Sequence, residues 1–242
     1  LTEPTPRLGI TEDEAKECFS FRNISDTEAE LTYYNKDCGT DVVIPAMIGD
    51  REVTSIYQYT FNNMGITSLY IPDTIKTIGT SSFSGNNINS LYIPSSVVLI
   101  EEAAFSRNSI KSLSIDEGIK TIGSRAFQYN QLTEAVIPDS ATTIGACAYC
   151  DNPIPNHSFL YVKNGDSYDY SSIRGYIGDL SEFPDKVFRI PSEVNGIKLK
   201  TIESSSFSSM SLQGWEVVIP NTVTNIKDVA FAYSGISKVN IP

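Results

Sequence analysis

Apolar and polar positions recur along this chain with a fixed step. The stretch Leu69-Tyr70-Ile71-Pro72 returns as Leu91-Tyr92-Ile93-Pro94, so Ile71 and Ile93 stand 22 residues apart. Within a unit, apolar residues lie 4, 7, 12 and 17 positions after this isoleucine, a spacing that fits neither a sustained helix nor a long strand. A period in the low twenties is typical of a solenoid, in which each repeat forms one coil.

Each unit opens with a segment that alternates in polarity. The period of two predicts a short strand in which Leu69 and Ile71 point inward while Ser68 and Tyr70 point outward. A proline then ends the strand, because it removes a backbone donor and fixes φ. This proline is Pro45, Pro72, Pro94, Pro138, Pro191, Pro220 or Pro242, and Asp116 replaces it once.

The second half of each unit carries a small residue, an aromatic residue and then an asparagine. The stacked aromatic residues predict a continuous spine inside the solenoid, and the small residues let neighbouring coils approach closely. The asparagines predict either left-handed turns or a ladder of bonds to neighbouring backbone. The aromatic residues are Phe83, Phe105, Phe127, Tyr149 and Phe231, and the asparagines are Asn86, Asn108, Asn130 and Asn152.

Two enlarged units divide the chain into two consecutive arrays. Residues 44–61 and 190–207 align without gaps, and both carry five extra residues around a turn dipeptide, which predicts a short hairpin at the opening of each array. The predicted segments are a linker at 1–15, an N-terminal cap and first array at 16–154, an irregular cap-like insert at 155–187 and a second array at 188–242. The caps cover the apolar cross-section of a terminal coil.

The composition of the chain excludes some classes of partner. The 242 residues include 18 basic and 29 acidic ones, which argues against nucleic acid as a partner. No apolar run is long enough to cross a membrane, and no signal peptide is visible, so we expect no membrane insertion. The sequence ends in the first strand of a coil, at Ile241-Pro242, and we expect either a longer array or self-association at this edge.

Residues suited to metal or redox chemistry are few. Cys18 and Cys38 flank the proposed cap hairpin, where a disulfide is one alternative. Cys147 and Cys150 have the spacing of a zinc or redox half-site, but we prefer a structural or free thiol pair, since a zinc site would need two more ligands and His157 is the only histidine. Asn164, Asp166 and Asp169 lack the spacing of a calcium loop, and we expect no metal, cofactor or catalytic residue.

The units resemble the BspA-like, Treponema pallidum-type leucine-rich repeat family, whose pattern is L-x-x-I-x-I-P-x-x-V-x-x-I-G-x-x-A-F-x-x-C/N-x-x-L. The match covers roughly residues 42–154 and 188–242. The resemblance implies a β-rich, right-handed solenoid of short strands, turns and short helical segments. It also implies a non-enzymatic protein, secreted or on a bacterial surface, that mediates adhesion to host matrix or other surface proteins.

Two other functions stay open. The arrays could form a spacer or a carbohydrate-binding module of a larger secreted enzyme, or the insert could form an enzymatic pocket at His157.

The outward stripe of the strands is the candidate binding surface. Stacked tyrosines beside small hydroxyls suit protein or sugar recognition, although the same stripe also fits a weakly polar sheet surface. The candidate residues are Ser68, Tyr70, Ser90, Tyr92, Ser114 and Glu134, with Ser112 and Val136 in the same stripe and the insert tyrosines Tyr161, Tyr168, Tyr170 and Tyr176 as second choices.

Overall fold

The computed structural model describes residues 12–145, 147–154, 159–164, 167–178, 180–208 and 210–241. The chain forms two compact units. The first comprises Leu1–Ala141 with Ala148–Pro155, and the second comprises Thr142–Cys147 with Asn156–Pro242. Each unit is described by itself below.

The first unit is built of short strands that follow one helix. Helix α1 (Glu12–Cys18) spans the predicted boundary between the linker and the cap. The strands are β1 (Phe19–Asn23), β2 (Glu28–Tyr34), β3 (Asp41–Val43), β4 (Met47–Ile48), β5 (Arg51–Ile56), β6 (Ser68–Tyr70), β7 (Thr77–Ile78), β8 (Ser90–Ile93), β9 (Leu99–Ile100), β10 (Ser112–Ile115) and β11 (Thr121–Ile122), with a 3-10 helix η1 (Lys36–Cys38) after β2.

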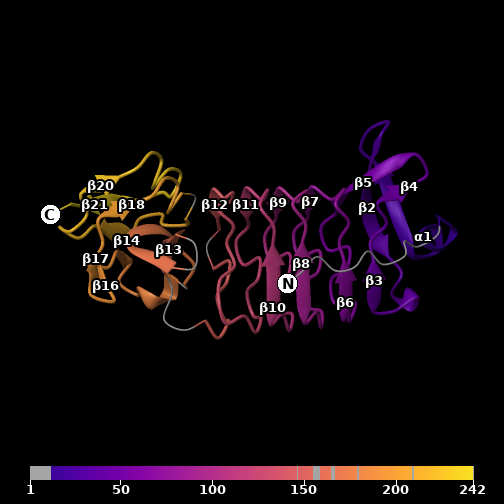
Figure 1. Cartoon of the computed structure of the whole chain (residues 1–242), viewed down its shortest axis with the longest axis horizontal. Helices are drawn as coiled ribbons and strands as arrows, with labels where there is room; N and C mark the ends of the chain where they lie inside the picture. Colours follow the sequence, from indigo (N-terminus) through magenta and orange to yellow (C-terminus); the bar gives the residue numbers. More distant parts are fainter. Residues whose placement is uncertain are drawn as a thin grey trace. The chain divides into compact units, whose positions relative to one another are not determined.

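These strands pair in parallel along two sides of the first unit, as expected for a solenoid. Strands β5, β7, β9 and β11 pair in register along one ladder, so that Ile56, Ile78, Ile100 and Ile122 follow one another. On the other side of the coils, β3 pairs with β6 and β8 with β10, as two separate two-stranded sheets (Figure 1). The coils therefore contribute strands to both sides, and the predicted repeat solenoid is confirmed.

An aromatic spine runs through the coils of the first unit. Neighbouring rings lie 4.7 Å apart between Phe61 and Phe83, 5.2 Å between Phe83 and Phe105, and 5.7 Å between Phe105 and Phe127. Tyr149 continues the stack 5.2 Å from Phe127. Phe83, Phe105 and Phe127 are fully buried, so the predicted spine is confirmed as the core of the array.

The asparagines form a ladder that links each coil to the one before it. Asn108 donates through Nδ2 to the carbonyls of Phe83 and Phe105, at 2.9 and 3.1 Å, and its Oδ1 accepts from the amide of Ile88 at 3.2 Å. Asn86, Asn130 and Asn152 repeat this pattern. The ladder is therefore the correct one of the two predicted roles, because left-handed backbone occurs one residue earlier, at Arg107 and its equivalents.

A hairpin caps the first array. Strands β1 and β2 are antiparallel, and β2 pairs in parallel with β5 of the opening coil. Phe19 and Tyr34 of the hairpin pack on Phe61, the first ring of the spine. A disulfide joins Cys18 to Cys38, with an S–S distance of 2.02 Å, across the ends of this cap. The predicted cap and the small hairpin of β4 and β5 in the opening coil are both present.

The second unit repeats this plan. Its elements are β12 (Thr143–Ile144), β13 (Phe159–Asn164), β14 (Ser167–Tyr176), η2 (Leu180–Glu182), β15 (Val187–Arg189), β16 (Glu193–Val194), β17 (Ile197–Lys198), β18 (Thr201–Ile202), β19 (Glu216–Val218), β20 (Asn225–Ile226) and β21 (Lys238–Asn240). Strands β13 and β14 form an antiparallel hairpin, and β14 pairs in parallel with β18 as β2 does with β5. The insert thus forms a cap-like hairpin, and its pairing is irregular, with register shifts on both sides of Tyr161.

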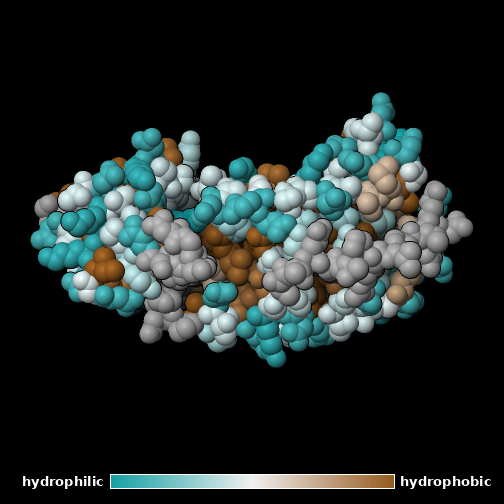
Figure 2. Space-filling view, in the orientation of Figure 1, coloured by the Kyte–Doolittle hydropathy of each residue, from teal (hydrophilic) through white to brown (hydrophobic). Residues whose placement is uncertain are grey.

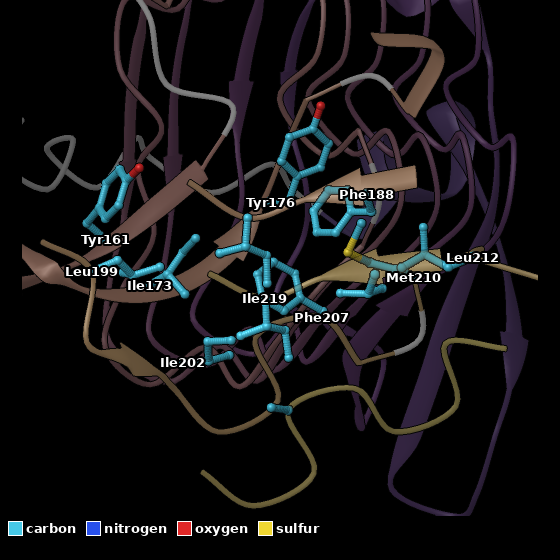
Figure 3. Close-up of a cluster of buried hydrophobic side chains, with 13 residues drawn as sticks. Tyr161, Ile173, Tyr176, Phe188, Leu199, Ile202, Phe207, Met210, Leu212 and Ile219 are labelled. Atoms are coloured by element: carbon cyan, nitrogen blue, oxygen red, sulfur yellow. The ribbon is translucent and has the colours of Figure 1, made fainter. Parts of the chain in front are cut away.

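The core of the second unit lies beneath this hairpin. Tyr176 packs edge-on against Phe188 at 5.1 Å, and Phe188 in turn contacts Phe207 at 5.4 Å (Figure 3). Phe207 stacks on Phe231 at 5.1 Å. Tyr161 is also part of this cluster, and burial raises the pKa of its hydroxyl to about 12. The hairpin therefore contributes its aromatic side chains mainly to the core.

Candidate interaction face

The outward side of β3, β6, β8 and β10, continued by Glu134 and Val136 of the next coil, is named here the tyrosine face. Strand β6 pairs with β3 so that Tyr70 lies opposite Val43, and β10 pairs with β8 so that Ser114 lies opposite Tyr92 and Ser112 opposite Ser90. Strand alternation turns Tyr92 outward because its neighbours Leu91 and Ile93 are buried. Strands β3 and β6 form one two-stranded sheet and β8 and β10 form another, and β6 lies next to β8, so the predicted residues of β6, β8 and β10 lie along one side of the unit.

An aspartate fixes one of the two tyrosines. Tyr92 donates its hydroxyl hydrogen to Oδ2 of Asp116 at 2.6 Å. Asp116 occupies the position where most coils have the strand-ending proline. The ring of Tyr92 is therefore held in place by the neighbouring coil, which lowers the entropy cost of using it in a contact.

Sequence reasoning noted the replacement of proline by Asp116 but missed this role. The repeat could have predicted this contact, because Asp116 directly follows the strand β10, which pairs with the strand of Tyr92.

The far end of the tyrosine face is built differently. Glu134 is exposed and Val136 is partly exposed, in a segment that is not a strand. The carbonyl of Val136 accepts a hydrogen bond from the Tyr149 hydroxyl at 2.5 Å. Tyr149 is buried, which raises the pKa of its hydroxyl, so this bond satisfies a polar group that the phenylalanines of the other coils lack.

Apolar surface accompanies the polar groups of this unit. Leu69, predicted to be inward, is only partly buried, as are Leu113 and Ile137. In the space-filling view, apolar surface is visible between bands of polar residues (Figure 2). The first unit therefore offers tyrosines, hydroxyls and apolar atoms together, a composition found in protein interfaces.

The second-choice tyrosines of the insert are less suited to binding. Tyr161 and Tyr176 are buried, at 8% and 2% exposure, because their rings complete the core of the second unit. Tyr170 is partly buried and packs edge-on against Tyr161 at 5.2 Å. The side chain of Tyr168 lies outside the described residues.

All four cysteines are oxidised. Cys147 and Cys150 are disulfide-bonded, and since Cys18 pairs with Cys38 they pair with each other. The predicted structural pair is therefore a disulfide, and the alternatives of free thiols and of a zinc half-site are wrong for this state.

The remaining candidate metal and catalytic positions give no assembled site. His157 and Asp166 and the side chain of Asn164 lie outside the described residues. Asp169 instead accepts bonds from the amide and hydroxyl of Ser171, at 2.9 and 2.6 Å, which lower the pKa of its carboxyl group. Among the described residues, no group of three or more His, Cys, Asp or Glu side chains is arranged to hold a metal ion.

Within the described part of the chain, no helix has the length and apolar character needed to cross a membrane.

Solved structures of bacterial repeat proteins are similar to this chain. The pneumococcal vaccine antigen PcpA matches with a TM-score of 0.49 and 17% identity, over 93% of this chain and 68% of that one. A leucine-rich cell surface protein of Faecalibacterium prausnitzii matches at 0.33 and 18%, over 98% and 77%. A leucine-rich repeat protein of T. pallidum matches at 0.31 and 17%, over 93% and 70%.

A search among curated proteins finds no match. The family model of the BspA type leucine rich repeat region matches residues 17–155 and 182–242, in six copies. These ranges include most of the chain and both arrays. The chain therefore belongs to the BspA type leucine-rich repeat family.

Proposed function

We propose that this chain is a non-enzymatic protein of the cell surface or the extracellular space, which binds another protein through the tyrosine face and so mediates adhesion, for example to host matrix proteins. The family and the surface proteins among the similar structures support a role in protein interaction. Four oxidised cysteines support an extracellular location, because disulfides persist in oxidising compartments.

The observation that carries the proposal is the presentation of Tyr70 and Tyr92 on the neighbouring strands β6 and β8, with Tyr92 held in place by Asp116. Tyrosine offers a large contact area with few rotatable bonds, and such residues are enriched at the centres of protein interfaces. The hydroxyls of Ser90, Ser112 and Ser114 stand beside them on the same face. Their small side chains leave the rings accessible to a partner.

The test is attachment of purified protein to immobilised fibronectin and fibrinogen, measured by biolayer interferometry. The double variant Tyr70→Ala with Tyr92→Ala should bind about tenfold more weakly, since each removes an aromatic anchor. Its melting temperature should stay close to that of the parent, because neither ring belongs to the buried spine.

A matched control removes two tyrosines elsewhere on the first unit. Tyr59 and Tyr129 are 56% and 44% exposed and lie in turns, outside the strands of the tyrosine face. Tyr59→Ala with Tyr129→Ala should leave attachment unchanged. Equal losses in both double variants, or full attachment by the Tyr70 and Tyr92 variant, would show that the tyrosine face is not the site.

A further inference from the structure

The tyrosine face and the turns that follow its strands carry charge of one sign. None of the outward strand positions, and none of the following turn positions, is a lysine or arginine. Six acidic residues occupy them, all exposed except Asp116, which is partly buried: Asp41, Asp73, Asp116, Glu117, Glu134 and Asp139. The basic residue nearest in sequence to these strands is Lys111, which directly precedes β10.

Elsewhere on the first unit, cations stand beside the acids. Lys76 contacts Glu28 at 2.6 Å, Arg125 contacts Glu102 at 3.1 Å, and Arg22 pairs with Glu30. Positive and negative charges are therefore mixed on those surfaces, whereas the charged residues at the outward positions of the tyrosine face and in its following turns are all acidic. A surface of uniform sign favours a partner of the opposite sign, both in the encounter and in the bound state.

The two rings add a second preference for positive charge. The face of a tyrosine ring attracts a lysine ammonium or an arginine guanidinium placed over it. The same contact already exists within this unit, where the Arg107 guanidinium lies 4.7 Å from the centre of the Tyr129 ring. On the tyrosine face, the hydroxyl oxygen of Tyr92 lies 2.6 Å from Oδ2 of Asp116, so an oriented ring and a carboxylate stand side by side. A cation there would meet both groups.

We infer that the tyrosine face takes a lysine- or arginine-rich segment of a partner protein. This inference rests on the proposed function and specifies the chemistry of its partner. The aliphatic stems of lysine and arginine would lie along the tyrosine rings, while their charged groups would approach the carboxylates at the strand ends.

The test measures binding of a fluorescent lysine–glycine peptide to the full chain by fluorescence anisotropy, with glutamate–glycine and serine–glycine peptides of equal length as controls. Only the lysine peptide should bind, and its affinity should fall as sodium chloride is added, because these are exposed charges. It should also compete with the immobilised matrix protein.

Charge variants separate the tyrosine face from the overall negative charge of the chain. Asp116→Asn with Glu134→Gln should weaken binding of the lysine peptide about fivefold, a loss of roughly threefold or less per exposed pair. Asp50→Asn with Glu102→Gln makes the same change in net charge on other parts of the first unit, where both side chains are exposed and stand beside an arginine. This control should change the affinity less than about twofold.

Each outcome is decisive. Equal weakening by both charge pairs, or binding of the glutamate peptide, would overturn the inference. So would competition by a neutral oligosaccharide when the lysine peptide does not compete, an outcome that would favour a carbohydrate ligand. If matrix attachment depends on Tyr70 and Tyr92 but the lysine peptide does not bind, only this inference fails. If attachment does not depend on the tyrosines, the proposed function itself fails.

Discussion

The equivalent sheets of the two units present different surfaces. In the first unit, the outward positions of β6, β8 and β10 are two tyrosines and four serines. In the second unit, β15, β19 and β21 pair in the same parallel way, but their outward positions contain no aromatic residue and mix both charges. Glu216 and Lys238 even form an ion pair at 3.1 Å between neighbouring strands.

This difference favours the first unit as the one that binds under the proposed function. In the second unit, ion pairs between neighbouring strands already give the charged side chains partners of opposite sign. A binding partner would therefore gain little by contacting these charges. The first unit instead presents two tyrosine rings, and the charged residues on the tyrosine face and in its following turns are acidic. Under the proposed function, the same backbone plan carries a binding surface in the first unit and, in the second, a surface whose charges pair with one another.

The two caps differ as well. Phe19 lies opposite Tyr34 in the first hairpin, and Phe159 lies opposite Tyr176 in the second. The first cap is closed by the disulfide between Cys18 and Cys38. The second cap contains no cysteine in its sequence, and its aromatic side chains pack in the cluster around Phe188. The first unit should therefore lose more stability when its covalent link is removed.

Truncation of a spine ring should have the largest effect. Phe105→Ala removes a fully buried ring that stacks between Phe83 and Phe127, and we expect a loss of about 3–5 kcal/mol in the stability of the first unit. Phe207→Ala should cause a similar loss confined to the second unit. Hydrogen exchange of peptides from each unit measures both effects. Equal loss of protection in both units by either variant would contradict separate cores.

Removal of the disulfide in the first cap should have the second-largest effect on stability. Cys18→Ser with Cys38→Ser opens a loop with a sequence separation of 20, and we expect a loss of about 3 kcal/mol in urea unfolding. The control Cys147→Ser with Cys150→Ser opens a much shorter loop and should cost less. A larger loss in the control would show that the first cap does not depend on its link.

Removal of one asparagine of the ladder should lower the stability of the first unit slightly less. Asn108→Ala removes the side chain that bonds the backbone of Phe83, Phe105, Ser106 and Ile88, and should cost about 2 kcal/mol. The equivalent residue in the last coil of the second unit is Ser234, whose hydroxyl bonds only the Phe231 carbonyl. Ser234→Ala should cost about 1 kcal/mol, and thermal denaturation of both variants measures the two losses. Equal costs would remove the distinction between the two arrays.

The smallest expected effect is a gain in stability. The hydroxyl of Ser82 is buried and has no hydrogen-bond partner, while the equivalent positions in later coils are Ala104, Ala126 and Ala148. Ser82→Ala should therefore stabilise the first unit by about 1 kcal/mol in urea unfolding. Ser206, the equivalent residue in the opening coil of the second unit, bonds the Ile173 carbonyl at 3.1 Å, so Ser206→Ala should destabilise. A loss in both variants would mean that Ser82 has a partner in solution.

Much of the fold could be predicted because each slot recurs in every coil. Phe83, Phe105 and Phe127 identify the spine by their spacing alone, and the turn dipeptides at Gly49-Asp50 and Asn195-Gly196 identify the small hairpins. The second cap was harder to predict, because register shifts around Tyr161 break the alternation that marks a strand. Its inward tyrosines therefore look like surface residues in the sequence.

The candidate site could be predicted only in part. The period places Tyr70 and Tyr92 in one stripe, but it does not show that Tyr92 is anchored. That bond depends on a single departure from the repeat, Asp116, and on the strand register that brings the two side chains within 2.6 Å. Features that follow the repeat are visible in sequence, whereas contacts between exceptional residues appear only in three dimensions.

Hydroxyl-radical footprinting of the chain, free and bound to immobilised fibronectin, tests the central claim most directly. Exposed tyrosine rings are modified by the radical, and a partner that covers them lowers the extent of modification. We predict protection of Tyr70 and Tyr92, with Tyr233, which is 92% exposed in the second unit, modified equally in both states. Protection of Tyr233 without protection of Tyr70 and Tyr92 would contradict the assignment of binding to the first unit.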